Sequence, residues 1–218
     1  MDYRARFSEL NMKEEPLLLG IESSCDETAA AVVRGRHLLS SVILSSAAEQ
    51  AKYGGVVPEI ASRAHTDAIS TAVHSALEEA NVRKEELDAV AVTYGAGLLG
   101  ALLVGLSFAK SFAYSLNIPL LAVNHIRGHM AAAYLTDPLL KPPFITLLAS
   151  GGHTAVLYTK SFTEFEILGS TRDDAAGEAF DKAARVLGLP YPGGPNIEKL
   201  AAQGKPCIAF PKMFKGNG

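Results

Sequence analysis

Two segments of this chain share one pattern: a buried strand, a short polar turn, and a returning strand that opens with Thr-Ala. The first copy covers residues 17–33 with its turn at 24–27, and the second covers residues 144–158 with its turn at 150–153. Each returning strand alternates small and β-branched residues, which is typical of a hairpin. The sequence therefore predicts an internal duplication, with two related lobes.

A third strand and a helix follow each hairpin in the sequence pattern. The expected third strands cover residues 38–45 and 162–168, the following helices cover 58–80 and 174–187, and the first copy continues with strands at 89–93 and 119–123 and helices at 98–116 and from residue 125. A β-β-β-α-β-α-β-α unit used twice describes the α/β actin-like ATPase (ASKHA) fold, in which a nucleotide lies between two lobes. We expect that fold here, with an incomplete second lobe.

Three prolines interrupt helix continuity between the two copies. They are Pro138, Pro142 and Pro143. The predicted division is a loose N-terminal tail over residues 1–16, a first lobe over 17–137 and a truncated second lobe over 138–218. The residues after Lys205, which end with 215–218, are expected to form a connection that is cut short.

Composition narrows the class of protein. The 218 residues are 48% hydrophobic and 20% charged, which favours a folded domain with a buried core over general disorder. The formal net charge of −3 argues against a wholly basic nucleic-acid coat protein but permits a local basic patch. Cys25 and Cys207 are too few for a disulfide scaffold, which indicates a reducing cytoplasm, and the N-terminal residues do not resemble a secretory signal.

One segment is long enough to cross a bilayer, because residues 89–109 contain no charge. Four glycines interrupt it, its first residues read as a strand and turn, and no Lys- or Arg-rich flank accompanies it. We therefore expect a core strand and helix, and no membrane span.

His125 and His129 are four residues apart in an expected helix, so both imidazoles lie on one helix face and can reach one metal ion. Two ligands do not complete a metal site, so a further donor is needed. The alternative is an ordinary pair of surface histidines, which an isolated pair at this spacing favours.

Two polar turns are expected to face the same cleft. The turn at 150–152, Ser-Gly-Gly, can present successive backbone N–H groups to a phosphate, or can be a tight hairpin that needs positive φ. Asp26 and Glu27 lie at the matching turn of the first lobe, where they could hold a metal-bound water or an amine, or act only as turn residues.

The helix expected from residue 174 has several candidate roles. The aspartates at 173–174 are expected to cap it, and Asp181 is expected to pair with Arg185 one turn later. Gly177 inside a helix costs about 1 kcal/mol relative to alanine, which indicates close packing at that point. Residues 191–195 are expected to form a rigid turn that could frame a ribose or base.

Five motifs in order resemble those of the TsaD family, the tRNA threonylcarbamoyladenosine transferases. They are GIESSCDET at 20–28, YGGVVPE at 53–59, NHIRGH at 124–129, ASGGHT at 149–154 and DDAAGEAFDK at 173–182. The resemblance extends from about residue 17 to residue 203, and five motifs in matching order are far more specific than any single one.

The resemblance implies a reaction in which the threonylcarbamoyl group passes from threonylcarbamoyl-AMP to the N6 amine of the tRNA adenosine beside the anticodon. It also implies a TsaB-like paralogue and a TsaE-like ATPase as partners. The helices over 68–77 and 98–116 are expected to contribute to the core of the first lobe. Their outer residues, such as Ala72 and Leu77, could also pack against an actin-like partner. Because the chain is net acidic, we expect the isolated chain to bind tRNA weakly and in a salt-sensitive way.

The resemblance also implies site residues. His125 and His129 would be two ligands of an iron ion, Fe(2+), and Asp26 or Glu27 is a weak candidate for deprotonating the amine. The substrate adenylate would be bound by Leu148, Ala149, Ser150, Gly151, Gly152, Asp181 and Gly194.

The chain departs from the family pattern in three respects. Ala96 stands where the family usually has proline, and Arg127 stands where an acid is common between the histidines. The family's third metal ligand, an aspartate, belongs to a C-terminal region that this sequence lacks. The alternatives are a non-catalytic actin-like partner subunit, or a metallopeptidase or sugar kinase with the same fold; the absence of a His-Glu-x-x-His run weakens the peptidase interpretation.

Overall fold

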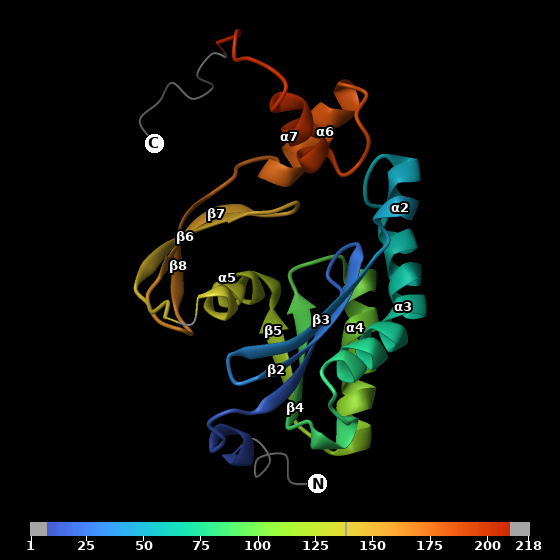
Figure 1. Cartoon of the computed structure of the whole chain (residues 1–218), viewed down its shortest axis with the longest axis vertical. Coiled ribbons are helices and arrows are strands. Elements are labelled where there is room, and N and C mark those ends of the chain that lie inside the picture. Colours follow the sequence, from blue (N-terminus) through green and yellow to red (C-terminus); the bar gives the residue numbers. More distant parts are fainter. Residues whose placement is uncertain (1–7, 138, 210–218) are drawn as a thin grey trace.

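A computed structural model describes residues 8–137 and 139–209, and its first part is built around a mixed five-stranded sheet (Figure 1). The strands are β1 (Leu17–Glu22), β2 (Glu27–Arg34), β3 (His37–Ser45), β4 (Ala89–Gly95) and β5 (Leu120–Asn124), in the order β3-β2-β1-β4-β5. β1 pairs antiparallel with β2 and parallel with β4. This is the predicted first unit of the ASKHA fold. The start of the predicted tail, Pro138 at the predicted boundary and the part of the predicted connection from residue 210 onward lie outside the described residues. The division into lobes stays a prediction.

Helices cover both faces of this sheet (Figure 1). α3 (Pro58–Glu79) and α4 (Leu99–Leu116) pack on one face, and α5 (His125–Thr136) lies on the other. Alternation in β1 directs Leu17, Leu19 and Ile21 into the core with α3 and α4. The short elements α2 (Ala47–Gln50), η1 (Ala51–Tyr53) and η2 (Lys84–Glu86) belong to the connections.

α4 is long and apolar enough to cross a bilayer by length and composition alone. Buried residues such as Ala101 and Ala109 lie on the side of α4 that contacts β4 and α3, whereas Leu99 and Leu103 are exposed, so core packing accounts for part of that apolar sequence. The expectation that Ala72 and Leu77 are outer residues is wrong, because both are buried against the sheet.

The second part of the chain repeats the hairpin plan. β6 (Phe144–Ala149), β7 (Thr154–Thr159) and β8 (Phe165–Ser170) form an antiparallel sheet in that order, followed by α6 (Ala176–Val186) and α7 (Gly193–Ala201). β8 begins three residues later than predicted, because Ser161 Oγ accepts hydrogen bonds from the Thr163 and Glu164 amides and extends the turn.

Three expectations around α6 are wrong. The aspartates at 173–174 do not cap it, since Ala175 holds the N-cap position; Asp174 instead pairs with Lys182. Asp181 does not pair with Arg185, because its carboxylate accepts a hydrogen bond from the Gly193 amide at 2.6 Å. That bond lies at the start of α7, which replaces much of the expected rigid turn over 191–195.

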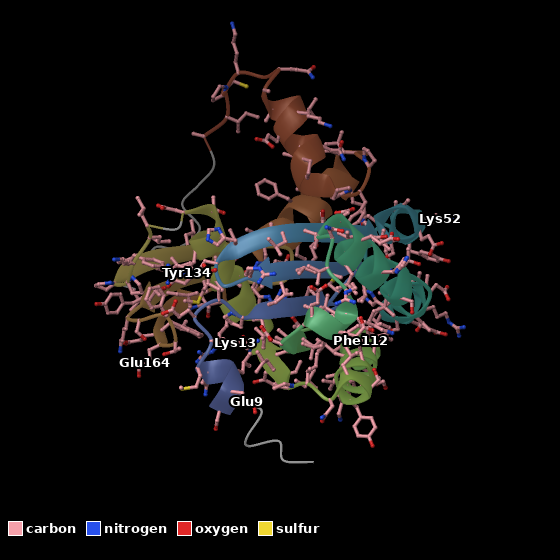
Figure 2. The ribbon with its side chains drawn as sticks, turned by 60° about the horizontal axis from the view of Figure 1, so that its bottom comes forward. Glu9, Lys13, Lys52, Phe112, Tyr134 and Glu164 are labelled. Atoms are coloured by element: carbon pink, nitrogen blue, oxygen red, sulfur yellow. The ribbon has the colours of Figure 1, made fainter. Side chains whose placement is uncertain are left out.

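α5 connects the two sheets. Its residue Met130 packs against Leu148 and Leu157 of the second sheet. Figure 2 shows Tyr134, also in α5, beside the β7–β8 loop that carries Glu164, and its ring lies 5.1 Å from that of Phe162 in this loop. The helix that carries the paired histidines therefore contacts both sheets.

Gly177 provides a direct test of the expected close packing. A Cβ at this position would lie 2.7 Å from Gly151 Cα and 2.9 Å from the Ser150 carbonyl oxygen, whereas a Cβ at Gly128 in α5 would meet nothing within 4 Å. We expect Gly177→Ala to lower the free energy of unfolding by about 1–3 kcal/mol. We expect Gly128→Ala to raise it by about 0.5–1 kcal/mol, because glycine is unfavourable within a helix. Urea denaturation of both variants measures this; equal stabilisation by both would contradict the packing.

Candidate functional site

A cleft of about 720 Å³ lies between elements of both sheets. The β1–β2 turn, the loop before α3 and the start of α5 contribute one wall, and the β6–β7 turn and α6 contribute the other. The cleft contains many of the predicted site residues, namely Asp26, Glu27, His125, His129, Ser150, Gly151, Gly152 and Asp181. The structure thus brings together motifs that are more than 100 positions apart in the sequence.

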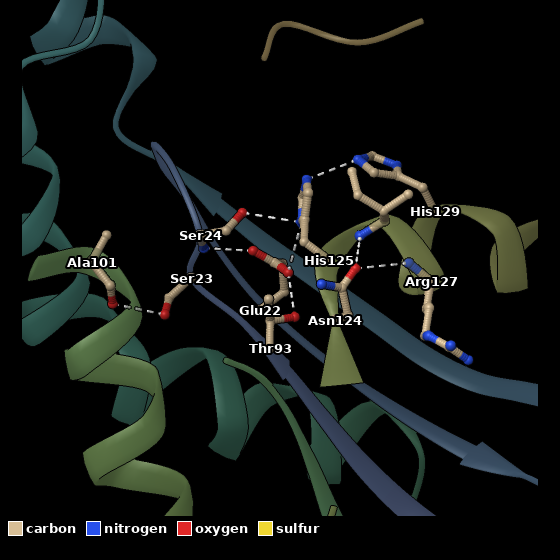
Figure 3. Close-up of polar contacts among 10 residues, drawn as sticks. Glu22, Ser23, Ser24, Thr93, Ala101, Asn124, His125, Arg127 and His129 are labelled. Atoms are coloured by element: carbon tan, nitrogen blue, oxygen red, sulfur yellow. Dashed lines mark hydrogen bonds and ion pairs between the residues drawn. The ribbon is translucent and has the colours of Figure 1, made fainter. Parts of the chain in front are cut away.

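The two histidines converge on one point (Figure 3). Their Nε2 atoms are 2.9 Å apart. Asn124 positions the helix that carries them, since its side-chain oxygen accepts hydrogen bonds from the amides of Ile126 and Arg127 at the N-terminus of α5. The predicted i, i+4 geometry is therefore present.

Glu22 orients His125, a role that the sequence patterns did not indicate. His125 Nδ1 lies 3.3 Å from Glu22 Oε2 and 3.2 Å from Ser24 Oγ (Figure 3). Burial acts to raise the pKa of Glu22, but hydrogen bonds from His125, Ser24 and Thr93 outweigh it and lower the pKa to about 2. When Nδ1 of His125 carries the proton, it donates a hydrogen bond to the Glu22 carboxylate. The lone pair on Nε2 of His125 then remains available to a ligand in the cleft.

The donor set fits part of a metal site. Two nitrogen ligands that lie about 2.1 Å from one ion, with an angle of about 90° between the two bonds, are about 3 Å apart. The observed separation of the two Nε2 atoms, 2.9 Å, is close to this value. Burial and the neighbouring His125 lower the pKa of His129, which favours the neutral imidazole that a metal requires. Within residues 8–137 and 139–209, no three His, Cys, Asp or Glu side chains converge to complete such a site.

The Ser-Gly-Gly turn faces the cleft with unused amides. Ser150 and His153 close the turn through the Ser150 amide and the His153 carbonyl at 2.8 Å. Neither Gly151 nor Gly152 has positive φ, so the tight-turn explanation for these glycines is wrong. Over the described residues the amides of Gly151 and Gly152 donate to no protein acceptor, and both residues are exposed.

α6 begins directly against this turn. The Gly177 amide donates to the Ser150 carbonyl at 3.0 Å, and the Ala176 amide donates to Thr154 Oγ1 at 2.8 Å. The close approach needs a glycine at 177. The first turn of α6 therefore fixes the position of the Ser-Gly-Gly backbone.

One of the two carboxylates in the β1–β2 turn already forms a hydrogen bond across the cleft. Tyr191 Oη donates to Asp26 Oδ2 at 3.1 Å across the cleft, and loss of solvation together with the Asp26 charge raises the pKa of Tyr191. Glu27 is exposed and lines the cleft. Of the two carboxylates, Asp26 therefore already contributes to holding the lobes together.

Cys25 occupies the same turn, and loss of solvation and the adjacent Asp26 charge raise the pKa of its thiol to about 12. Both cysteines are exposed, but because only the thiolate reacts, we expect iodoacetamide to modify Cys25 at pH 8 at least about 100-fold more slowly than Cys207. The rate at Cys25 should rise about tenfold per pH unit, because the thiolate fraction grows in that proportion below the pKa. Peptide mass spectrometry over pH 7–10 measures both rates. Equal rates of modification at the two cysteines at pH 8 would contradict the raised pKa of Cys25.

Several predicted residues are not on the cleft wall. The Leu148 side chain is buried in the second core, and neither Ala149 nor Gly194 is among the residues that line the cleft. Asp181 reaches the cleft while its carboxylate holds the Gly193 amide. Their assignment to substrate binding stays a prediction.

The cleft also contains residues to which the motifs gave no role. They are Glu22, Ser24, Gly54, Lys182, Arg185 and Tyr191, among others. Lys182 lies within the motif at 173–182, so the sequence alone could have indicated that it belongs to the site. The sequence places Arg185 one turn after Asp181 and Tyr191 in the turn at 191–195, but no local pattern indicates their bonds to Gly54 and Asp26.

A family profile described as TsaD, tRNA N6-adenosine threonylcarbamoyltransferase, matches residues 37–217. The chain belongs to the TsaD family. The tRNA N6-adenosine threonylcarbamoyltransferase of Clostridium novyi (strain NT) is 58% identical over 203 residues, which are 92% of this chain and 60% of that protein. The protein with the same name in Clostridium botulinum (strain Hall) is 56% identical with the same coverage. This TsaD-family chain thus spans about 60% of the length of the curated relatives it matches.

A solved structure supports the fold independently. Component A of the (R)-2-hydroxyglutaryl-CoA dehydratase of Acidaminococcus fermentans superposes with a TM-score of 0.51 and 15% identity, covering 90% of this chain and 62% of that one. At this identity the similarity concerns the fold alone. It agrees with the α/β actin-like architecture of the TsaD-family chain.

Proposed function

We propose that this chain provides the substrate cleft of a tRNA N6-adenosine threonylcarbamoyltransferase. The adenosine N6 amine attacks the carbamoyl carbon of threonylcarbamoyl-AMP, a C–N bond forms, and the bond from that carbon to the phosphate oxygen breaks. AMP leaves with the electron pair, and the amine proton passes to a base or to water. The products are the N6-threonylcarbamoyl adenosine in tRNA and AMP.

One observation carries this proposal: the paired histidines of the first lobe and the Ser-Gly-Gly turn of the second lobe line the same cleft. The unused amides of Gly151 and Gly152 are suited to the phosphate oxygens of the adenylate. Donors held in place for the leaving group stabilise charge as it develops, without reorganisation. An activated acyl adenylate then needs chiefly orientation toward the amine.

His125 and His129 are the residues that would hold an Fe(2+) ion, with Glu22 orienting His125 through Nδ1. When bound, such an ion supplies Lewis acidity and a fixed positive charge for the carbamoyl or phosphate oxygens. The separation of the two Nε2 atoms and the conditions that favour a neutral His129 support this assignment. It also favours the transferase over a non-catalytic partner subunit, for which paired ligands have no use.

No catalytic base is assigned. Glu27 is the exposed carboxylate at the acidic turn, whereas one oxygen of Asp26 already accepts a hydrogen bond from Tyr191. Either carboxylate would have to lie within about 3 Å of the attacking amine to accept its proton.

The macromolecular partners follow from the same proposal. A tRNA is the acceptor, and a TsaB-like paralogue and a TsaE-like ATPase are the proposed protein partners, in a cytoplasmic setting. The formal charge of −3 means that phosphate contacts on the tRNA must come from local basic side chains or from the partners.

The proposal is tested by supplying threonylcarbamoyl-AMP and unmodified tRNA to the 218-residue chain and to a version extended to the length of its relatives. We expect tRNA-dependent release of AMP with the extended version. Failure of both versions to release AMP, with partners added, would contradict the proposal.

A further inference from the structure

The cleft wall is acidic, although the proposed substrate is an anion. Five carboxylate residues line it, namely Glu22, Asp26, Glu27, Glu178 and Asp181, against two cationic residues, Lys182 and Arg185. A phosphate entering such a cleft is repelled unless a cation meets it directly. The two cations differ in their hydrogen-bond partners.

Lys182 is already neutralised by its neighbours. Its Nζ atom lies 2.6 Å from Asp174 Oδ1 and 3.1 Å from Glu178 Oε1. These two contacts hold the ammonium group along α6 and raise the pKa of Lys182. Binding a phosphate would require Lys182 to exchange one of these carboxylates for it.

Arg185 lies one turn further along the same helix, in a different environment. Its Nη2 donates to the Gly54 carbonyl at 2.6 Å, and it forms no ion pair with any carboxylate in the part of the chain that the structure describes. A guanidinium has five N–H donors, so this bond leaves others for a ligand. Arg185 therefore brings a positive charge to the cleft without a carboxylate partner.

The Gly54 contact also fixes where this charge lies. Gly54 belongs to the first lobe and has φ of 71°, a backbone conformation suited to glycine, and a Cβ there would lie 3.6 Å from Arg185 Nε. The bond joins residues 131 positions apart, one in each lobe. The bond thus ties the exposed guanidinium to the Gly54 loop, and both residues line the cleft.

We propose that Arg185 binds the phosphate of a mononucleotide in this cleft while its bond to Gly54 keeps the two lobes together. This rests on the proposed function, in which that mononucleotide is the adenylate. A cleft of about 720 Å³ is in the range of sites that enclose a small molecule. The same charge could instead meet a phosphate of an RNA strand, and the size of the enclosed cleft favours the mononucleotide.

The test compares AMP with adenosine as probes, using calorimetry on the 218-residue chain. Arg185→Gln should weaken AMP binding about tenfold or more, because a charge-assisted hydrogen bond is lost, and should change adenosine binding less than twofold. Arg185→Lys should fall between the two, since lysine keeps the charge without the planar fork. Arg172→Gln is the matched control, because Arg172 is exposed, precedes the same helix and does not line the cleft.

Three results would overturn the assignment. They are unchanged AMP affinity in Arg185→Gln, an equal loss for adenosine and AMP, and a loss confined to a short single-stranded RNA used as a third probe. Thermal unfolding of each variant establishes that it is folded before binding is compared. None of these results bears on the transferase proposal, which product formation decides separately.

Discussion

Replacing His125 and His129 together by alanine is expected to remove specific Fe(II) or Zn(II) binding from this chain. The two Nε2 atoms lie 2.9 Å apart, and no group of three or more His, Cys, Asp or Glu side chains offers an alternative metal site among the described residues. Loss of an outer hydrogen-bond partner of a metal ligand costs about 10–100-fold in affinity, so loss of both ligands should cost more. Calorimetry with the metal alone measures the effect.

Wild-type affinity itself should be modest, because water would fill the remaining coordination positions. His74→Ala is the control, since His74 is exposed on α3 and pairs only with Glu78 one turn away. Tight metal binding that survives the double substitution would contradict the proposed location of the site.

Replacing His65 by leucine should cause the largest loss of stability of any single histidine substitution. His65 in α3 is fully buried, and its ring nitrogens bond to Thr28 Oγ1 at 2.7 Å and to the Cys25 carbonyl at 2.9 Å. Leucine would leave the buried Thr28 hydroxyl and the Cys25 carbonyl without this hydrogen-bond partner, and an unpaired buried group costs about 1–3 kcal/mol. We expect a total loss of about 2–5 kcal/mol in the free energy of unfolding, measured by urea denaturation.

His74→Leu provides the comparison on the same helix, where an exposed substitution should change stability by less than about 0.5 kcal/mol. Because the two His65 bonds fix the β1–β2 turn, the same variant should also loosen the backbone around Asp26. Equal stability of the two leucine variants would show that the buried bonds contribute nothing.

The features that the sequence predicted well depend on local periodicity. The strands over 17–22, 27–34 and 144–149 and the helix over 58–79 agree with their predicted ranges to within one or two residues. The i, i+4 relation of His125 and His129 follows from helix geometry alone. The close packing at Gly177 was also predicted, because glycine is unfavourable within a helix unless a neighbouring group leaves no room for a Cβ atom.

The features that the sequence did not predict depend on contacts between distant residues. Glu22 lies 103 positions before His125, and no pattern within the β1–β2 turn marks it as the partner of that imidazole. The expected Asp181–Arg185 pair satisfied the i, i+4 rule, but in the folded chain Asp181 bonds to Gly193 and Arg185 bonds to Gly54. Tertiary structure therefore overrode a local preference that is worth only a few tenths of a kcal/mol.

The burial of Ala72 and Leu77 in α3 also depends on contacts with distant residues, which a local pattern does not predict. Both lie on a helix with apolar residues on more than one side, and only the folded sheet decides which side is buried. The candidate partner surface therefore moves to exposed positions such as Leu99 and Leu103 on α4. These side chains are accessible in the described chain.

The proposed transferase reaction is tested by measuring N6-threonylcarbamoyl adenosine in tRNA by nucleoside mass spectrometry. The reaction contains threonylcarbamoyl-AMP carrying isotopically labelled threonine, the proposed partners, and the chain extended to the length of its relatives. We expect label in the adenosine beside the anticodon, and a loss of at least about 100-fold when His125 and His129 are both alanine. Absence of labelled nucleoside with the wild-type protein, or an unchanged rate with the double variant, would contradict the account.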